Sequence, residues 1–129
     1  AAGVTACSVI TEDDAGAALG ADPGPGEGVT HLGASSCAYG NSPSLVTVNL
    51  LPSGGKVAYD HAWAGAATGQ LVAIPGVGDA AFGATKGPMA SVEFYKGDAL
   101  VTVVLIVGET GTPPQDRALT LAKSAARRM

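Results

Sequence analysis

Residues 89 to 107 carry the clearest structural signal in the chain. They read MASVEFYK, then Gly97-Asp98, then ALVTVVLIV, which predicts two β-strands joined by a two-residue turn. Counting outward from the turn pairs apolar residues on one face: Phe94 with Val101, Val92 with Val103 and Ala90 with Leu105. The opposite face pairs Tyr95 with Leu100, Glu93 with Thr102 and Ser91 with Val104. The first face therefore has to point into a core, and the second suits partial exposure.

Three further segments are predicted as strands. The segment LVTVNLL at 45–51 alternates apolar with polar residues, which is typical of a half-buried strand. SSCAY at 35–39 precedes it, and AAFGA at 80–84 predicts a short strand that leads toward the hairpin. The segment ADPGPGEG at 21–28 is rich in proline and glycine, so we expect a loop there.

A short helix is predicted over EDDAGAAL at 12–19. Thr11 can cap its free N–H groups, Asp14 stands at the capping-box position, and three acidic residues face the positive end of the helix. We expect these acids to favour the helix rather than to bind a metal ion. The helix has few apolar residues, so it has to pack on the rest of the domain.

A second helix is predicted at the C-terminal end. Thr112, Pro113 and Gln115 provide a cap, a proline at the first turn and a capping-box partner. An apolar stripe at helical spacing follows, made of Ala118, Leu121, Ala122, Ala125, Ala126 and Met129. The middle segment KVAYDHAWAGAA at 56–67 also has helical spacing, so we expect a helix there too.

Composition sets the class of protein. With 47% hydrophobic and 14% charged residues, the chain is not disordered. Its net charge of −4 argues against a nucleic-acid partner, and no apolar run approaches the roughly 18 residues that span a bilayer. We expect one domain, 1–129, of the α+β class, in which a single antiparallel sheet of four to five strands packs against an N-terminal and a C-terminal helix. We expect it to be a monomer.

The chain has only two cysteines, Cys7 and Cys37. A disulfide between them would close a loop of about 30 residues and contribute about 3–4 kcal/mol. Two alternatives stay open: two free thiols, or a lipid on Cys7 if VTAC at 4–7 is a lipobox. The lipobox interpretation needs an apolar leader before the cysteine, which the sequence does not show. We favour the disulfide, which would place the protein in an oxidising compartment.

The segment LVAIPGVGDAAFGA at 71–84 matches the dinucleotide fingerprint G-x-G-x-x-A at Gly76, Gly78 and Ala81. The fingerprint holds a pyrophosphate only where a helix begins at the second glycine. The residues downstream, FGATKGPMASV, predict a strand instead. We therefore interpret the glycines as a tight connection, in which Asp79 hydrogen-bonds nearby backbone N–H groups, and expect no nucleotide cofactor.

Few residues of the chain offer chemistry. His31 and His61 are the only histidines, and their spacing does not predict a metal site. Tyr59, His61 and Trp63 concentrate aromatic and imidazole groups within five residues, so a small ligand would bind there first. The alternative for this segment is that Trp63 caps the core and His61 lies in water. An enzyme of the hydrolase type would rely on Asp60 and His61.

The order of several motifs resembles one group of proteins. These motifs are CSVITEDDAGAALG, SSCAYG, VGDAAFGA, SVEFYKGDALVTVVL and ALTLAKSAARRM. Their order is similar to that of the small extracytoplasmic domains of actinobacterial lipoproteins and secreted proteins, whose function is largely unassigned. The resemblance implies a disulfide between Cys7 and Cys37 and a structural turn at 78–81, and it carries over no catalytic residue.

We therefore expect a non-catalytic secreted or cell-envelope module that binds a protein partner or a small apolar ligand, without a metal or cofactor. The alternatives are the hydrolase-like enzyme and a structural or inhibitor-like interaction domain.

Overall fold

The computed structural model describes residues 5–19, 24, 26–31, 34–41, 44–51, 54, 57, 72–74, 76–86, 89–106 and 115–128. Its helices are α1 (Ala6–Val9), α2 (Glu12–Leu19) and α4 (Gln115–Arg127). Its strands are β1 (Glu27–His31), β2 (Ala34–Asn41), β3 (Ser44–Leu51), β4 (Val72–Ala73), β5 (Ala80–Lys86), β6 (Met89–Lys96) and β7 (Ala99–Ile106).

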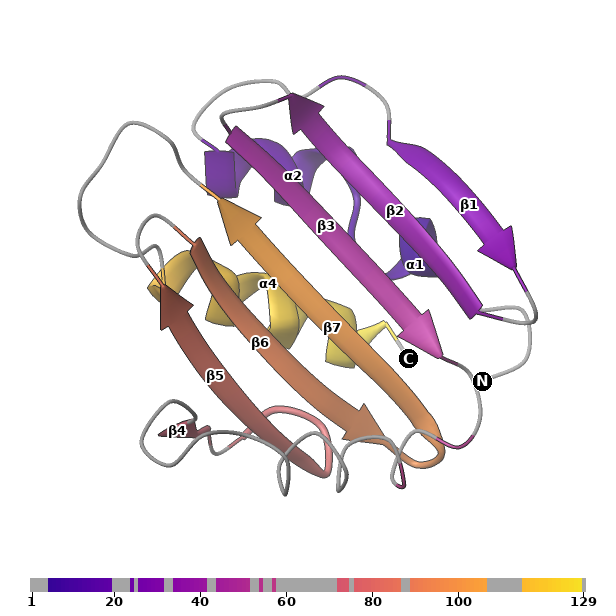
Figure 1. Cartoon of the computed structure of the whole chain (residues 1–129), viewed down its shortest axis with the longest axis vertical. Helices are drawn as coiled ribbons and strands as arrows, with labels where there is room; N and C mark the ends of the chain where they lie inside the picture. Colours follow the sequence, from indigo (N-terminus) through magenta and orange to yellow (C-terminus); the bar gives the residue numbers. More distant parts are fainter. Residues whose placement is uncertain are drawn as a thin grey trace.

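All described strands form one antiparallel sheet in the order β1-β2-β3-β7-β6-β5-β4 (Figure 1). The α+β class and the single antiparallel sheet are therefore confirmed. The expected four to five strands are too few, because the sheet has six strands of five to eight residues and the two-residue β4. The strand missed at one edge is β1, whose residues EGVTH lack an apolar alternation. Its first two residues, 27 and 28, were wrongly assigned to the loop at 21–28.

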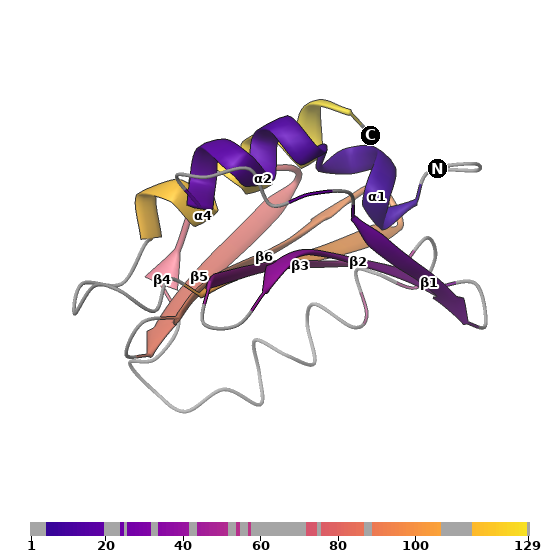
Figure 2. The same cartoon turned by 90° about the horizontal axis from the view of Figure 1, so that it is seen from above.

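The helices cover one face of the sheet (Figure 2). Between the two layers lies a core made of the apolar side chains that alternate along β2, β3, β6 and β7, together with apolar side chains of α1, α2 and α4. The hairpin register is confirmed pair by pair, from Phe94 opposite Val101 to Glu93 opposite Thr102. Its predicted apolar face is fully buried: Ala90, Val92, Phe94, Val101, Val103 and Leu105.

The disulfide between Cys7 and Cys37 is present, with the two Cα atoms 5.1 Å apart. It joins α1 to β2, so the alternative of two free thiols is wrong. The bond also occupies the sulfur atom that a lipid on Cys7 would need. The backbone N–H of Ala6 donates a hydrogen bond of 2.8 Å to the buried Ser35 hydroxyl, which is a second link between these elements.

The N-terminal helix has the predicted bounds and cap. The N–H of Asp14 donates to the Thr11 hydroxyl at 3.2 Å, and the N–H of Thr11 donates to the Asp14 carboxylate at 3.1 Å, which is a capping box. The one-turn helix α1 ahead of it was not predicted. At the other end, α4 buries Ala118, Leu121, Ala122 and Ala125 of the predicted stripe. Its proposed caps Thr112 and Pro113, and Met129, lie outside the described residues.

Candidate functional site

The face of the sheet turned away from the helices, here called the distal face, carries a continuous row of polar residues. Ser36 on β2 pairs with Asn49 on β3, Asn49 pairs with Thr102 on β7, and Thr102 pairs with Glu93 on β6. These four residues, the polar row, therefore lie side by side across four neighbouring strands, at the spacing of about 5 Å that separates paired residues in a sheet. Each alternates with a buried residue on its own strand, so the four side chains share one face.

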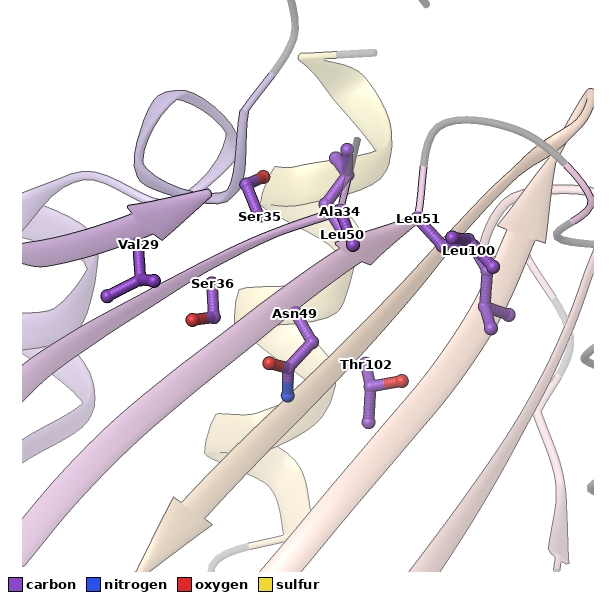
Figure 3. A pocket seen from close by; sticks show the side chains of 9 residues that line it. All are labelled: Val29, Ala34, Ser35, Ser36, Asn49, Leu50, Leu51, Leu100 and Thr102. Carbon is purple, nitrogen blue, oxygen red and sulfur yellow. The ribbon is translucent and has the colours of Figure 1, made fainter. Parts of the chain in front are cut away.

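A pocket opens over one end of the polar row, with a volume of about 270 Å³. It is lined by Val29, Ala34, Ser35, Ser36, Asn49, Leu50, Leu51, Leu100 and Thr102. Figure 3 shows Val29, Ser36, Asn49 and Thr102 directed to the same side of the sheet. The pocket thus combines aliphatic walls with two hydroxyl groups and one amide from the row. That is the composition of small-molecule sites, which are mostly apolar and hold a few placed polar groups.

Apolar residues border the pocket on two sides of the polar row. Leu51 and Leu100 are opposite each other, two residues along their strands from Asn49 and Thr102 and on the same face. Apolar residues therefore flank the polar row on that side. At the β1 edge of the sheet, Val29 pairs with Ser36 and is 64% exposed. It extends the apolar lining of the pocket to that edge.

Glu93 is the one acidic residue of the polar row. The Thr102 hydroxyl donates a hydrogen bond of 2.9 Å to its Oε1. Its Oε2 is buried and has no hydrogen-bond partner in the described part of the chain. Burial raises the pKa of the Glu93 carboxyl, and the hydrogen bond from Thr102 opposes that rise. A buried carboxyl oxygen without a hydrogen-bond partner costs folding free energy and is uncommon in native structures, which sets Glu93 apart from the rest of the row.

The side chains of Asn49 and Ser36 are the polar groups of the row that are available for hydrogen bonds to a ligand. Neither makes a hydrogen bond to another described residue, and Asn49 is exposed. An amide offers two donor hydrogens and an acceptor oxygen, and a hydroxyl offers one donor and two acceptor positions. The row can therefore offer several hydrogen bonds to a molecule in the pocket.

The residues that the sequence nominated for ligand binding, Tyr59, His61 and Trp63, lie outside the described residues, as does Asp60 of the enzyme alternative. Of the range 56–67 only Val57 is described, so a helix there stays a prediction. His31 is the last residue of β1. The described part of the chain contains no group of three or more His, Cys, Asp or Glu side chains placed to hold a metal ion.

The glycine-rich segment does not form a dinucleotide-binding turn. Gly76 and Gly78 have φ angles of 82° and 57°, and strand β5 begins at Ala80, where the fingerprint needs a helix. The Asp79 carboxylate accepts a hydrogen bond of 2.7 Å from the N–H of Gly97, as its position in the connection predicted. The segment therefore ties the start of β5 to the turn of the hairpin.

A second depression, of about 390 Å³, lies beside this connection and contains Lys96, Lys123 and Arg127. Two of these cations make hydrogen bonds at the C-terminal end of α4. Lys96 donates to the carbonyl oxygen of Ala126 at 2.8 Å, and Arg127 donates to the Ser124 hydroxyl at 3.1 Å. Cations are expected at a helix C-terminus, where they stabilise the free carbonyl groups. We assign this depression to the architecture of the fold.

The polar row could not be found by local sequence reasoning. The pair Glu93–Thr102 was predicted from the hairpin, but Asn49 and Ser36 join it only through the pairing of β3 with β7 and of β2 with β3. The pairing of β3 with β7 joins segments about 50 residues apart in the chain, and no turn between them sets its register.

No family model matches the chain, and no curated protein or solved structure matches it. The resemblance to actinobacterial extracytoplasmic domains therefore stays a prediction. None of the helices among the described residues has the length and apolarity needed to cross a membrane.

Proposed function

We propose that this protein is a non-catalytic binding module whose pocket on the distal face takes up a small, largely apolar molecule. The observation that carries the proposal is the pocket itself. Its lining includes the aliphatic side chains of Val29, Leu51 and Leu100, and Ser36, Asn49 and Thr102 add polar groups to it. Ligand pockets for drug-sized molecules span roughly 300–1,000 Å³, so a pocket of about 270 Å³ suits a molecule of about one ring.

A secreted or cell-envelope location belongs to the same proposal. It is supported by the disulfide between Cys7 and Cys37, because such bonds persist in oxidising compartments. The resemblance to extracytoplasmic actinobacterial domains agrees with this location. An envelope module that binds a small molecule needs a rigid support, and the sheet provides one because the pocket residues come from paired strands.

The experiment is a titration of the ¹⁵N-labelled protein with one-ring probes, followed by amide chemical shifts. The probes are cyclohexanol, cyclohexylamine, cyclohexanone and cyclohexanecarboxylate. We expect saturable shifts at Val29, Leu51 and Leu100 with at least one probe. The absence of saturable shifts with all four, or shifts confined to another part of the fold, would overturn the proposal.

A pair of variants locates the binding. Ser36→Phe places a ring in the pocket and is expected to abolish the saturable shifts. Ser91→Phe makes the same change on the same face but outside the pocket lining, so it is the matched control. Binding that survives Ser36→Phe in a folded protein would contradict the assigned site.

A second candidate function is the capture of an extended protein segment. Strand β1 pairs only with β2 in the described part of the chain, and its Val29 is 64% exposed. An edge strand of this kind can accept another strand by backbone hydrogen bonding. The two functions separate by amide hydrogen exchange, since strand addition gives the amides at the open edge of β1 new hydrogen-bond partners and protects them. A pocket ligand contacts side chains and is expected to leave the exchange of these amides unchanged.

A further inference from the structure

Glu93 fixes the direction in which the Thr102 hydroxyl donates its hydrogen. A hydroxyl group has one hydrogen and two acceptor positions. The hydrogen of Thr102 is directed to Oε1 of Glu93 at 2.9 Å, on the side of the row away from the pocket. With that hydrogen engaged, Thr102 can offer the pocket only an acceptor.

Glu93 keeps this direction as long as its carboxyl is ionised. An ionised carboxylate has no hydrogen to donate, so it can only accept from Thr102. Reversing the Thr102 hydroxyl toward the pocket would leave both carboxylate oxygens without a partner, since Oε2 already has none in the described residues. A half-buried carboxylate that loses its one hydrogen bond from the described residues is disfavoured.

Ser35 also lines the pocket, but its buried hydroxyl lies on the opposite side of the sheet, where it accepts a hydrogen bond from the N–H of Ala6. The polar groups of the distal face other than Thr102 do not discriminate in this way. The side chains of Ser36 and Asn49 have no hydrogen bond to described residues, so each can turn either a donor or an acceptor toward a ligand. Any preference of the pocket for one type of hydrogen-bonding ligand therefore has to come from Thr102, and through it from Glu93.

We propose that Glu93 is a specificity-determining positioning residue, which holds the Thr102 hydroxyl as an acceptor and so makes the pocket select small apolar molecules bearing a hydroxyl or amine hydrogen. This inference rests on the proposed function and names the ligand class of the same pocket. Molecules of equal shape with only a carbonyl or ether oxygen leave Thr102 without a partner and bind less tightly. The carbonyl or ether oxygen of such a molecule would also be repelled by the lone pairs of the Thr102 hydroxyl.

The test compares cyclohexanol with cyclohexanone, which share a ring and an oxygen position and differ by the donor hydrogen. Both are titrated at pH 8 into the labelled full chain. One net hydrogen bond corresponds to about a fivefold difference in Kd, so the alcohol is expected to bind about fivefold more tightly. Glu93→Leu releases the Thr102 hydrogen toward the pocket, and the ratio is then expected to fall to one or to reverse.

Three further variants separate this role from a structural one. Glu93→Gln can accept from Thr102 through its oxygen or donate to it through its NH₂ group, so it is expected to weaken the preference for the alcohol without abolishing it. Thr102→Val removes the hydroxyl while keeping the shape of the side chain, and is expected to abolish the preference even if Glu93→Leu does not fold. Glu27→Leu makes the same acid-to-leucine change at an exposed site of β1 and is expected to leave the ratio unchanged.

Equal Kd values for the two probes in the wild-type protein would overturn the inference while leaving the proposed function intact. A preference that persists in Thr102→Val would also overturn it. Failure of both probes, the amine and the carboxylate to bind would instead overturn the proposed function.

Discussion

The phenolic hydroxyl of Tyr39 donates a hydrogen bond of 2.6 Å to the carbonyl oxygen of Ile10. This bond joins β2 to the junction between α1 and α2, in the same region as the disulfide between Cys7 and Cys37. Tyr39 is buried, and burial raises the pKa of its hydroxyl, which keeps the group protonated and able to donate. The N-terminal helices are therefore held on the sheet by one covalent link and by polar contacts from β2.

Tyr39→Phe is expected to lower the free energy of unfolding by about 1–3 kcal/mol. The substitution removes the hydroxyl and leaves the buried Ile10 carbonyl without that partner. Urea unfolding followed by circular dichroism measures the change. Ser8→Ala, which removes two exposed hydrogen bonds with the Thr5 backbone in the cap of α1, is a control expected to cost less. An unchanged midpoint in Tyr39→Phe would show that this bond does not stabilise the fold.

Gly78→Ala is expected to destabilise the protein much more than Gly76→Ala, although both glycines have positive φ. A Cβ on Gly78 would lie 2.6 Å from the carbonyl oxygen of Tyr95, a backbone atom that cannot move aside cheaply. A Cβ on Gly76 meets nothing within 4 Å, so that change adds only the cost of about 1–2 kcal/mol for a left-handed alanine. Thermal melts of the two variants give the comparison. Equal losses would mean that backbone conformation alone decides both positions.

Asp14→Asn is expected to lower the stability at pH 7 by about 0.5–1 kcal/mol, with the difference from wild type shrinking at low pH. Burial alone would raise the pKa of Asp14, but hydrogen bonds from Arg128 and Thr11 hold it below its ordinary value. A carboxyl with a lowered pKa stabilises the fold above its unfolded-state pKa, and this contribution disappears as pH falls through the folded-state pKa. Urea unfolding at pH 7 and pH 2.5 measures both values.

Asp13→Asn on the same helical turn is the matched control for Asp14, because Asp13 is exposed. It is expected to change the stability less at pH 7. A difference between Asp14→Asn and wild type that stays constant from pH 7 to pH 2.5 would contradict the role given to the Arg128 contact.

Glu93→Gln is expected to gain stability relative to wild type as pH rises from 4 to 7. Burial raises the folded-state pKa of Glu93, so its protonated form is favoured in the folded protein. The wild type is therefore stabilised at this position below the unfolded-state pKa and loses that contribution as pH rises through the folded-state pKa. Glutamine does not titrate, so the Glu93→Gln variant does not lose stability at this position as pH rises. Urea unfolding at the two pH values tests the sign, with the exposed Glu27→Gln as control.

Much of the fold was accessible from the sequence where a signal is local. The register between β6 and β7 follows from the two-residue turn at Gly97, and the cap of α2 follows from Thr11 and Asp14. The alternation in β3 also placed Val46 and Val48 in the core. Each of these features depends on residues within one turn or one strand.

The edge strand β1 and the one-turn helix α1 escaped prediction for a physical reason. Neither has an apolar period of its own, and each is ordered by what it contacts: β1 by pairing with β2, and α1 by the disulfide and the Ser35 hydroxyl. Segments of this kind take their structure from their partners rather than from intrinsic propensity.

The candidate site shows the same division. Local patterns were enough to assign each of Ser36, Asn49, Thr102 and Glu93 to a strand, and to pair the last two. The alignment of all four into one polar row, and the pocket above it, arose only when β2, β3, β7 and β6 became neighbours. That order is decided by the burial of the opposite, apolar face against the helices, which involves the whole core at once and is not encoded in any single segment.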